Sequence, residues 1–277
     1  MTASATTPSA TTPRTTPTRP TPTPGWVRAL AGAAAALVVL PLLGIVFRVE
    51  WAGFVARVTS DQALTALALS LRTATVATAL CLVLGVPLGI ALHRMRWRGR
   101  SVARALVLVP LVLPPVVGGL ALLFAFGRRG LVGGALESFG VTIAFSTTAV
   151  VLAQTFVAMP FTVLAVESSL AARGERLEAV AGTLGARPST ILRRVTLPSL
   201  KAALATGAVL AFARSLGEFG ATLTFAGSLA GTTRTAPLEI YLAREGDPQT
   251  AVALGLVLVA IAVVVVVVAF RPLGRGR

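Results

Sequence analysis

Long apolar segments alternate with short polar segments along most of the chain. Six apolar segments are long enough to cross a bilayer as helices, because the hydrocarbon core takes roughly 20 residues. They cover approximately residues 29–47, 63–92, 103–126, 142–168, 201–226 and 249–270. The last contains an unbroken valine run, and valine forms helix poorly in water but is forced into helix in lipid. The pattern predicts an all-α integral membrane protein with six transmembrane helices.

The composition agrees with this pattern. Hydrophobic residues make up 55% of the 277 residues and charged residues 13%, whereas soluble domains average about 25% charged residues. The net charge of +15 raises the possibility of nucleic-acid binding. However, the arginines lie between apolar segments and do not alternate with exposed aromatic residues, a placement typical of membrane topology. We therefore expect no nucleic-acid partner.

The basic residues indicate the orientation in the membrane. They concentrate in residues 93–104, 170–200 and 271–277, which fall on one side of a six-helix topology. The opposite loops hold fewer basic residues, namely Arg48, Arg57, Arg128, Arg129, Arg234 and Arg244. Because positive charge marks the cytoplasmic side, both the N-terminus and the C-terminus are predicted to be cytoplasmic.

Residues 1–25 consist almost entirely of Thr, Pro, Ala and Ser. Such a segment buries too little apolar surface to offset its ordering entropy, so we expect a disordered cytoplasmic tail before a membrane domain at 26–277. A cleaved signal peptide over residues 1–50 is the competing interpretation, but a signal normally begins with a short basic region.

Residues 170–200 form a long polar segment between the fourth and fifth predicted helices. The pattern predicts two short helices, the first ending near Gly185 and the second starting at Pro188 and ending at Pro198. Glycine suits a helix C-terminus and proline the first turn of a helix. A polar cytoplasmic elbow of this kind is typical of a docking surface.

The elbow resembles the EAA loop of bacterial binding-protein-dependent ABC importers. That pattern reads Glu-Ala-Ala, three residues, Gly, nine residues, then an aliphatic residue, any residue and Leu-Pro. The candidate coupling residues are Glu178, Ala179, Gly185, Ala186, Val195, Leu197 and Pro198. The distances from Gly185 to the aliphatic residue and Leu-Pro match, but Ala179 stands where the family has glutamate and Glu178 lies one residue early. The resemblance implies a coupling helix that fits into a cleft of a separate ATPase and moves the fifth span.

Several kinds of chemistry are excluded by residue types that are missing. The only lysine, Lys201, is not followed by Ser or Thr, so the chain has no P-loop. With Cys81 and His93 as the only residues of their kinds, neither a zinc nor an iron–sulfur site can be assembled, and no catalytic triad or carboxylate pair is evident. We expect a non-enzymatic chain that binds no cofactor, with ATP and Mg held by a partner ATPase.

The fifth predicted helix carries two charges. Arg214 and Glu218 are four residues apart and can neutralise one another, since a charge within a membrane helix costs about 2.5–3.5 kcal/mol. The candidate gate residues are Arg214, Ser215, Gly217, Glu218, Phe219, Gly220 and Thr222. The glycines permit close approach of another helix. A salt-bridged packing site is the alternative to a gate, and Glu218 is expected to hold Arg214 rather than to bind an anion.

The same region resembles molybdate permeases. The resemblance rests on residues 217–222, 225–227, 232–241, 113–119 and 127–130, and it covers roughly residues 60–270. Sulfate permeases usually have Gly-Glu-Tyr-Gly-Ser where this chain has Gly-Glu-Phe-Gly-Ala. The resemblance implies a permease subunit in a prokaryotic plasma membrane that transports molybdate, with tungstate not separable from it. It further implies a homodimer, a cytoplasmic ABC ATPase and an extracytoplasmic molybdate-binding protein.

Other interpretations remain open from the sequence. The nearest is a sulfate or thiosulfate ABC permease; a secondary transporter or channel would need related halves that are not visible, and a membrane enzyme lacks a catalytic constellation. Pro110, Pro114 and Pro115 indicate either a simple kink or a role in the pathway. Gly85 and Gly89 have the GxxxG spacing of close helix contacts.

Overall fold

The computed structural model describes residues 24–174 and 176–270. The expected disordered tail lies outside the described residues except for Pro24 and Gly25, and so do the basic residues 271–277. The chain divides into two units, residues 1–44 and 45–277, and each is described by itself. The described part of the first unit is a single apolar helix, α1 (Gly25–Arg48), whose last residues belong to the second unit.

All regular structure of the described residues is helical, which confirms the all-α part of the predicted fold class. The second unit contains α2 (Trp51–Val58), α3 (Asp61–Arg94), α4 (Arg100–Val112), α5 (Pro115–Phe126), α6 (Gly133–Ser138), α7 (Thr147–Arg173), α8 (Arg176–Thr183), α9 (Pro188–Ile191), the π-helical turn η1 (Leu192–Thr196), α10 (Leu197–Ser199), α11 (Lys201–Leu216), α12 (Gly220–Ala226), α13 (Ala236–Gly246) and α14 (Pro248–Phe270). Among the described residues four helices can each cross a membrane, or up to six segments if each of two bent pairs is one span.

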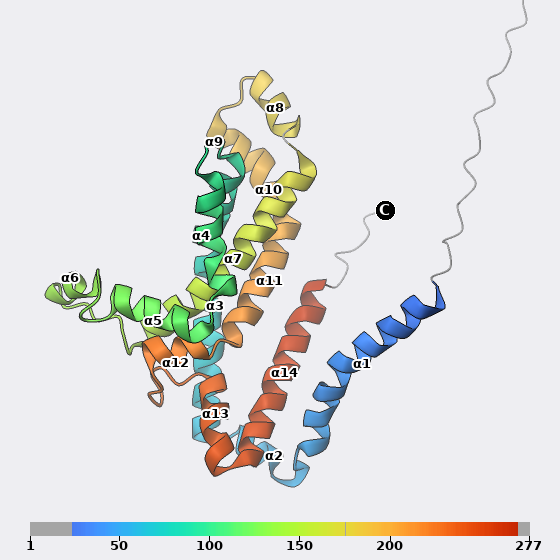
Figure 1. The fold of residues 1–277 in the computed structure, drawn as a ribbon, viewed down its shortest axis with the longest axis vertical. Coiled ribbons are helices and arrows are strands. Elements are labelled where there is room, and N and C mark those ends of the chain that lie inside the picture. The colour runs from blue at the N-terminus through green and yellow to red at the C-terminus, as the bar shows by residue number, and fades with distance from the viewer. Residues whose placement is uncertain (1–23, 175, 271–277) are drawn as a thin grey trace, which may run out of the picture. The chain divides into compact units, whose positions relative to one another are not determined.

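The centre of the second unit is formed by α3, α7 and α11 (Figure 1). The hydroxyl groups of Ser60 and Ser146 cap the N-termini of α3 and α7. The GxxxG glycines of α3 face α7, and a Cβ added at Gly89 would lie 3.0 Å from Val166 Cβ. The close contact expected from the glycine spacing is therefore confirmed.

The predicted third span is not one straight helix. It consists of α4 and α5, which are bent by 117° relative to each other at a break before Pro115. Leu113 and Pro114 have extended backbone conformations, because proline lacks an N–H donor and disfavours helix in the preceding residue. The bend turns α5 away from α4 and lays it against α12.

The prediction of a single helix over the fifth span, residues 201–226, was also wrong. The helix α11 ends at Leu216, residues 217–219 are not helical, and α12 begins at Gly220. The elbow helix likewise continues through Ser199 rather than ending at Pro198, and it is bent by 66° against α11. Pro198 is the second residue of α10, which directly follows the π-helical turn η1.

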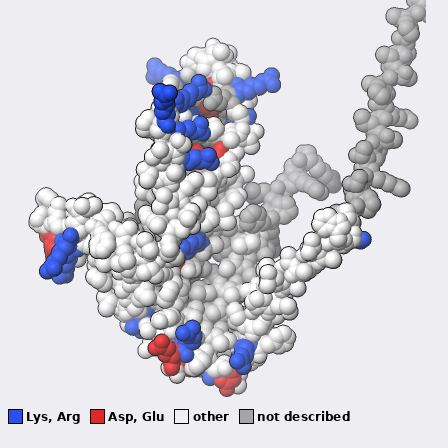
Figure 2. All heavy atoms as spheres, in the orientation of Figure 1, with Lys and Arg blue, Asp and Glu red and all other residues white. Residues whose placement is uncertain are grey.

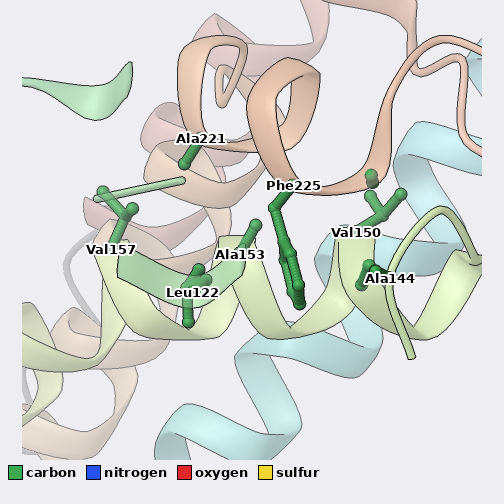
Figure 3. Packing of buried hydrophobic residues seen from close by; sticks show 9 residues of the cluster. Leu122, Ala144, Val150, Ala153, Val157, Ala221 and Phe225 are labelled. Carbon is green, nitrogen blue, oxygen red and sulfur yellow. The ribbon is translucent and has the colours of Figure 1, made fainter. Parts of the chain in front are cut away.

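A hydrophobic cluster holds α12 against α5 and α7. Phe225 is fully buried and points toward α7 beside Ala153, with Leu122 of α5 in the same cluster (Figure 3). A Cβ at Gly119 would lie 2.8 Å from the carbonyl oxygen of Ala221, so α5 and α12 touch along their backbones. This packing fixes where the chain re-enters the bundle after the break in α11.

We expect Gly119→Ala to destabilise the protein by about 1–3 kcal/mol, because the added methyl group meets backbone atoms that have no room to move. Gly255→Ala is the matched control, since a Cβ there meets no heavy atom within 4 Å. The control should be neutral or stabilising by up to about 1 kcal/mol, as alanine favours helix over glycine. Thermal unfolding in detergent measures both; equal melting temperatures would contradict the close contact.

Most charged side chains of the second unit gather in three places. Figure 2 shows basic side chains at the end that carries α8 to α10, a smaller group of both signs near α2 and α13 at the other end, and another group of both signs near α6 between them. In that second group Arg57 pairs with Glu50 at 2.7 Å and lies 3.7 Å from Asp247. The pKa of Asp247 is lowered mainly by the hydrogen bond from the Thr250 hydroxyl. The mostly uncharged zone between the ends is the part suited to lipid.

Candidate functional site

The elbow of residues 174–200 is built by two glycine-dependent turns. Gly174 ends α7 with φ of +65°, and Gly185 follows α8 with φ of +78°, a left-handed conformation that glycine adopts without steric penalty. The Gly185 and Ala186 amides donate back to the carbonyl groups of Gly182 and Ala181. The predicted division of the elbow into two helices at Gly185 is confirmed.

Glu178 ties the elbow to the rest of the structure. One carboxylate oxygen lies 2.7 Å from Arg94 Nη2 at the end of α3, and the other accepts a hydrogen bond of 2.6 Å from the hydroxyl of Thr196. A second link runs from the Arg173 guanidinium to the hydroxyl of Ser199. Displacement of α8 therefore acts on the ends of α3 and α7 and on the segment that leads into α11.

The predicted coupling residues divide into two groups in the structure. Ala179 is exposed on α8 and Pro198 is exposed on α10, whereas Val195 is half-buried. Leu197 packs against the buried cluster that joins α3, α7 and the start of α11, which includes Leu200. The second half of the elbow is thus anchored in the helix bundle, and the first half projects from it (Figure 1).

The outer surface of α8 is apolar. Leu177, Val180 and Leu184 are 62%, 52% and 82% exposed, and their spacing of three and four residues places them on one side of the helix. This apolar stripe of α8 lies in the most strongly basic part of the molecule. Exposed apolar side chains rimmed by polar residues mark surfaces that bind another protein.

The second candidate site is the break between α11 and α12. Glu218 is 1% exposed; one of its oxygens lies 2.6 Å from Arg214 Nη1, and the other accepts a hydrogen bond of 2.8 Å from the Ala221 amide. The carboxylate therefore neutralises an arginine at the end of α11 and caps the start of α12. The predicted pairing of Arg214 with Glu218 is confirmed, although the two residues do not share one helix.

Gly220 and Gly217 differ in what they permit. A Cβ at Gly220 would lie 2.8 Å from Pro115 Cβ, so this glycine allows α12 to touch the start of α5. Gly217 is exposed, and a Cβ there would meet only the Ala213 carbonyl oxygen of its own helix at 3.6 Å. The expected close helix approach is confirmed for Gly220, and at Gly217 no other described helix lies close. Phe219 stacks on Tyr241 of α13 with ring centroids 5.1 Å apart.

Buried polar groups surround the break. Ser215 and Thr222 are fully buried, and their hydroxyl groups have no hydrogen-bond partner among the described residues; the same is true of the Gln154 amide in α7. Gly207 of α11 lies against Thr162 of α7. Because these two helices run antiparallel, Ser215, eight residues after Gly207, lies level with Gln154, eight residues before Thr162. Buried polar groups without a partner are uncommon in folded proteins, so their clustering beside the break is a distinctive feature of this region.

Sequence reasoning missed three charged or polar residues inside predicted spans. Gln154 is one; Glu167 is another, 4% exposed and 3.1 Å from Arg104 Nε, where it links α7 to α4. The third is Arg72 in α3, which is exposed and has no hydrogen bond or ion pair with any described residue. Their position within apolar segments was the available signal, because ionisable groups there are usually functional or paired.

The two candidate sites lie at different levels and are joined by α11. The elbow leads into its first residue and the break follows its last, 16 residues later, a distance of about 24 Å at the helical rise. Within the described part of the chain no three His, Cys, Asp or Glu side chains come together as a possible metal site.

A multi-pass helical membrane protein with an exposed apolar stripe on a projecting elbow and a broken, charge-paired helix has the features of a transporter permease. The chain belongs to the family described as binding-protein-dependent transport system inner membrane component, which it matches over residues 85–273. The family is a membrane component of transport systems, so the chain is a multi-pass membrane permease and not the ATPase.

Curated relatives and solved structures agree with this family. The chain is 57% identical over 231 residues to the molybdenum transport system permease protein ModB of Mycobacterium tuberculosis, covering 83% of this chain and 88% of that protein. It is 42% identical over 219 residues to a probable molybdenum ABC transporter permease protein of Haloferax volcanii, covering 79% and 78%. A sulfate transport system permease protein, CysT of Salmonella typhimurium, is 35% identical over 209 residues, covering 74% and 76%.

The fold also matches a solved transporter. The structure is similar to a chain of the bacterial alginate ABC transporter in complex with an alginate pentasaccharide-bound periplasmic protein, with a TM-score of 0.69. The match covers 88% of this chain and 91% of that chain at 16% identity. At that identity the similarity establishes the fold.

Proposed function

We propose that this chain is the membrane-spanning permease subunit of an ATP-driven importer that carries molybdate, with tungstate as an equivalent substrate, into the cytoplasm of a prokaryote. The observation that carries the proposal is the 57% identity with a molybdenum permease over most of both chains. The lower identity of 35% to a sulfate permease favours molybdate over sulfate.

The proposed topology has six spans with both termini in the cytoplasm. The helix α11 has 16 residues and a length of about 24 Å, which falls short of the roughly 30 Å hydrocarbon core, so the break and α12 complete this crossing. The third span is assigned to α4 and α5, which together are long and apolar enough for a crossing although they are bent by 117°. The basic elbow end supports a cytoplasmic position for α8. The membrane domain is taken to start at residue 26.

Two copies of the chain are proposed to form the pathway, each bound to one ATPase subunit through the apolar stripe of α8. ATP and Mg belong to that partner, and this chain binds no cofactor. An extracytoplasmic molybdate-binding protein would dock at the opposite end, near α13. Glu178 connects the docking helix to α3 and to the entry of α11, so a movement of the ATPase would reach the break at Glu218 through rigid helices.

The ATPase rate of the reconstituted complex tests this proposal. We expect the chain to copurify with its ATPase in a two-to-two complex whose ATP hydrolysis is stimulated by the binding protein loaded with molybdate. The binding protein supplied with sulfate should give the basal rate. If sulfate rather than molybdate stimulates ATP hydrolysis, the substrate is sulfate. A rate of ATP hydrolysis that is the same with and without the binding protein would contradict the assignment as an importer.

A further inference from the structure

Arg72 is an unpaired positive charge within a predicted membrane span. It lies 11 residues into the 34-residue helix α3, about 16 Å from Asp61 and about 33 Å from Arg94 along the helix axis. Its side chain is exposed and has no hydrogen bond or ion pair with any described residue. Placing such a charge in the hydrocarbon core costs about 2.5–3.5 kcal/mol, so arginines in spans usually face water or a counter-charge.

Apart from Asp61 at the start of α3, the described spans hold no free carboxylate that could pair with Arg72. Glu167 and Glu218, the acidic side chains of the described spans apart from Asp61 at the start of α3, are already paired with Arg104 and Arg214. The helix α1 contains no acidic residue at all. A second copy of the chain has the same residues, so dimerisation brings no free carboxylate to Arg72 from within its spans. An anion from outside the described spans is therefore the counter-charge that remains for Arg72.

The surface around Arg72 mixes small and hydroxyl-bearing side chains with a few larger apolar ones. On the exposed side of α3, the residues at helical spacing from Arg72 are Thr65, Ala68, Thr75, Val76 and Ala79, of which Val76 is the one large apolar side chain. Leu64 and Leu71 lie to one side of this stripe. Thr65 also lines a cavity of about 330 Å³ that is bordered by Asp61, Arg234 and Glu239 near the start of α13. This stripe therefore leads from that cavity toward the middle of the membrane.

We propose that Arg72 binds the transported oxyanion during its passage through the membrane. This inference rests on the proposed function, because two copies of the chain would bring two Arg72 guanidinium groups to a tetrahedral oxyanion with two negative charges. Guanidinium groups form paired hydrogen bonds with such oxygens. The cavity itself is a poorer site, since Glu239 and the unpaired Asp61 border it.

Uptake of labelled molybdate into proteoliposomes that contain the ATPase and binding protein tests the inference. We expect Arg72→Gln to lower ATP-dependent uptake at least tenfold while ATP hydrolysis stays within twofold of the unmodified chain, and Arg72→Lys to retain uptake within about threefold. Arg48→Gln, which removes an exposed arginine at the end of α1, should leave uptake unchanged. Full uptake by Arg72→Gln would overturn the inference.

Arg72→Cys provides a second test that does not depend on how Arg72→Gln folds. Cys81 is the only native cysteine of this chain and is fully buried, so a water-borne thiol reagent should label this chain only at position 72 in the assembled complex. Attachment of an ethylammonium group should raise molybdate uptake at least threefold above that of the unlabelled Arg72→Cys variant, whereas attachment of an ethylsulfonate group should not. Excess molybdate should also slow the labelling reaction. Equal effects of the two reagents, or labelling that molybdate leaves unchanged, would contradict an anion site.

Lipid phosphate is the other source of an anion for Arg72. An arginine that only reaches a headgroup would give Arg72→Gln uptake equal to that of the unmodified chain, in both phosphatidylglycerol and phosphatidylcholine vesicles. Anion binding in the pathway gives the same tenfold loss in both lipids. Failure of the unmodified complex to take up molybdate with ATP would instead contradict the proposed function.

Discussion

Leu177→Asp is expected to uncouple the permease from its ATPase. The side chain is 62% exposed and lies in the first turn of α8, where a carboxylate is favoured by the helix dipole, so the fold should be unaffected. In the complex, however, the new charge would be buried in an apolar contact without a partner. A loss of 2 kcal/mol or more, typical for a residue at the centre of an interface, lowers affinity for the ATPase by about 30-fold or more.

The affinity of the ATPase subunit for the purified permease measures this effect directly. Leu184→Gln should weaken binding in the same direction, because Leu184 belongs to the same apolar stripe and is 82% exposed. Val141→Asp is the matched control; Val141 is 49% exposed and lies outside the elbow. Unchanged affinity of both α8 variants, or an equal loss with Val141→Asp, would show that the stripe is not the docking surface.

Glu218→Ala is expected to destabilise the protein by about 3–5 kcal/mol, the range for removing one partner of a buried ion pair. The substitution leaves Arg214, whose side chain is 29% exposed, without its counter-charge, and it removes the acceptor of the Ala221 amide. Glu218→Gln keeps an acceptor for that amide, so it should be less destabilising. Because Glu218 holds Arg214 and the start of α12, both variants should slow transport without changing the preference among anions.

A double-mutant cycle separates the ion pair from the helix cap. The double variant Arg214→Met, Glu218→Gln should recover part of the unfolding free energy that Glu218→Gln alone loses, because no charge is left without a partner. Denaturant unfolding of the detergent-solubilised chain gives the free energies. A Glu218→Gln variant with normal transport and an altered ratio of molybdate to sulfate uptake would contradict the positioning role.

The long helices and the elbow were predictable because each depends on local sequence. Apolar segments of sufficient length specify α3, α7 and α14 in lipid, and the glycine and proline at 185 and 188 specify the turn between the elbow helices. These signals require no knowledge of what the helices pack against.

The two broken helices were not predictable in the same way. The apolar segment of residues 201–226 continues across the break, so hydropathy alone gives one helix; the break depends on the Glu218 cap and on the contact between Gly220 and Pro115, which is distant in sequence. Pro114 and Pro115 signalled a kink in the third span, but a kink and a bend of 117° have the same local sequence. The direction of α5 depends on α12, which covers it.

The pairing of the charged residues could also be predicted only in part from the sequence. Arg214 and Glu218 are one helical turn apart, so their pairing followed from spacing. The contact between Glu178 and Arg94 joins residues that are 84 positions apart, and it became visible only once α3 and α8 were placed in space. The unpaired state of Arg72 likewise depends on where all other acidic side chains lie.

Molybdate uptake by the reconstituted transporter tests the central claim most directly. Proteoliposomes would contain the full chain, its ATPase and its binding protein, with labelled molybdate supplied with and without ATP and with excess sulfate as competitor. A molybdate importer takes up label only with ATP and continues to do so in the presence of sulfate. Uptake that is independent of ATP and of the binding protein, or uptake that sulfate abolishes, would contradict the claim.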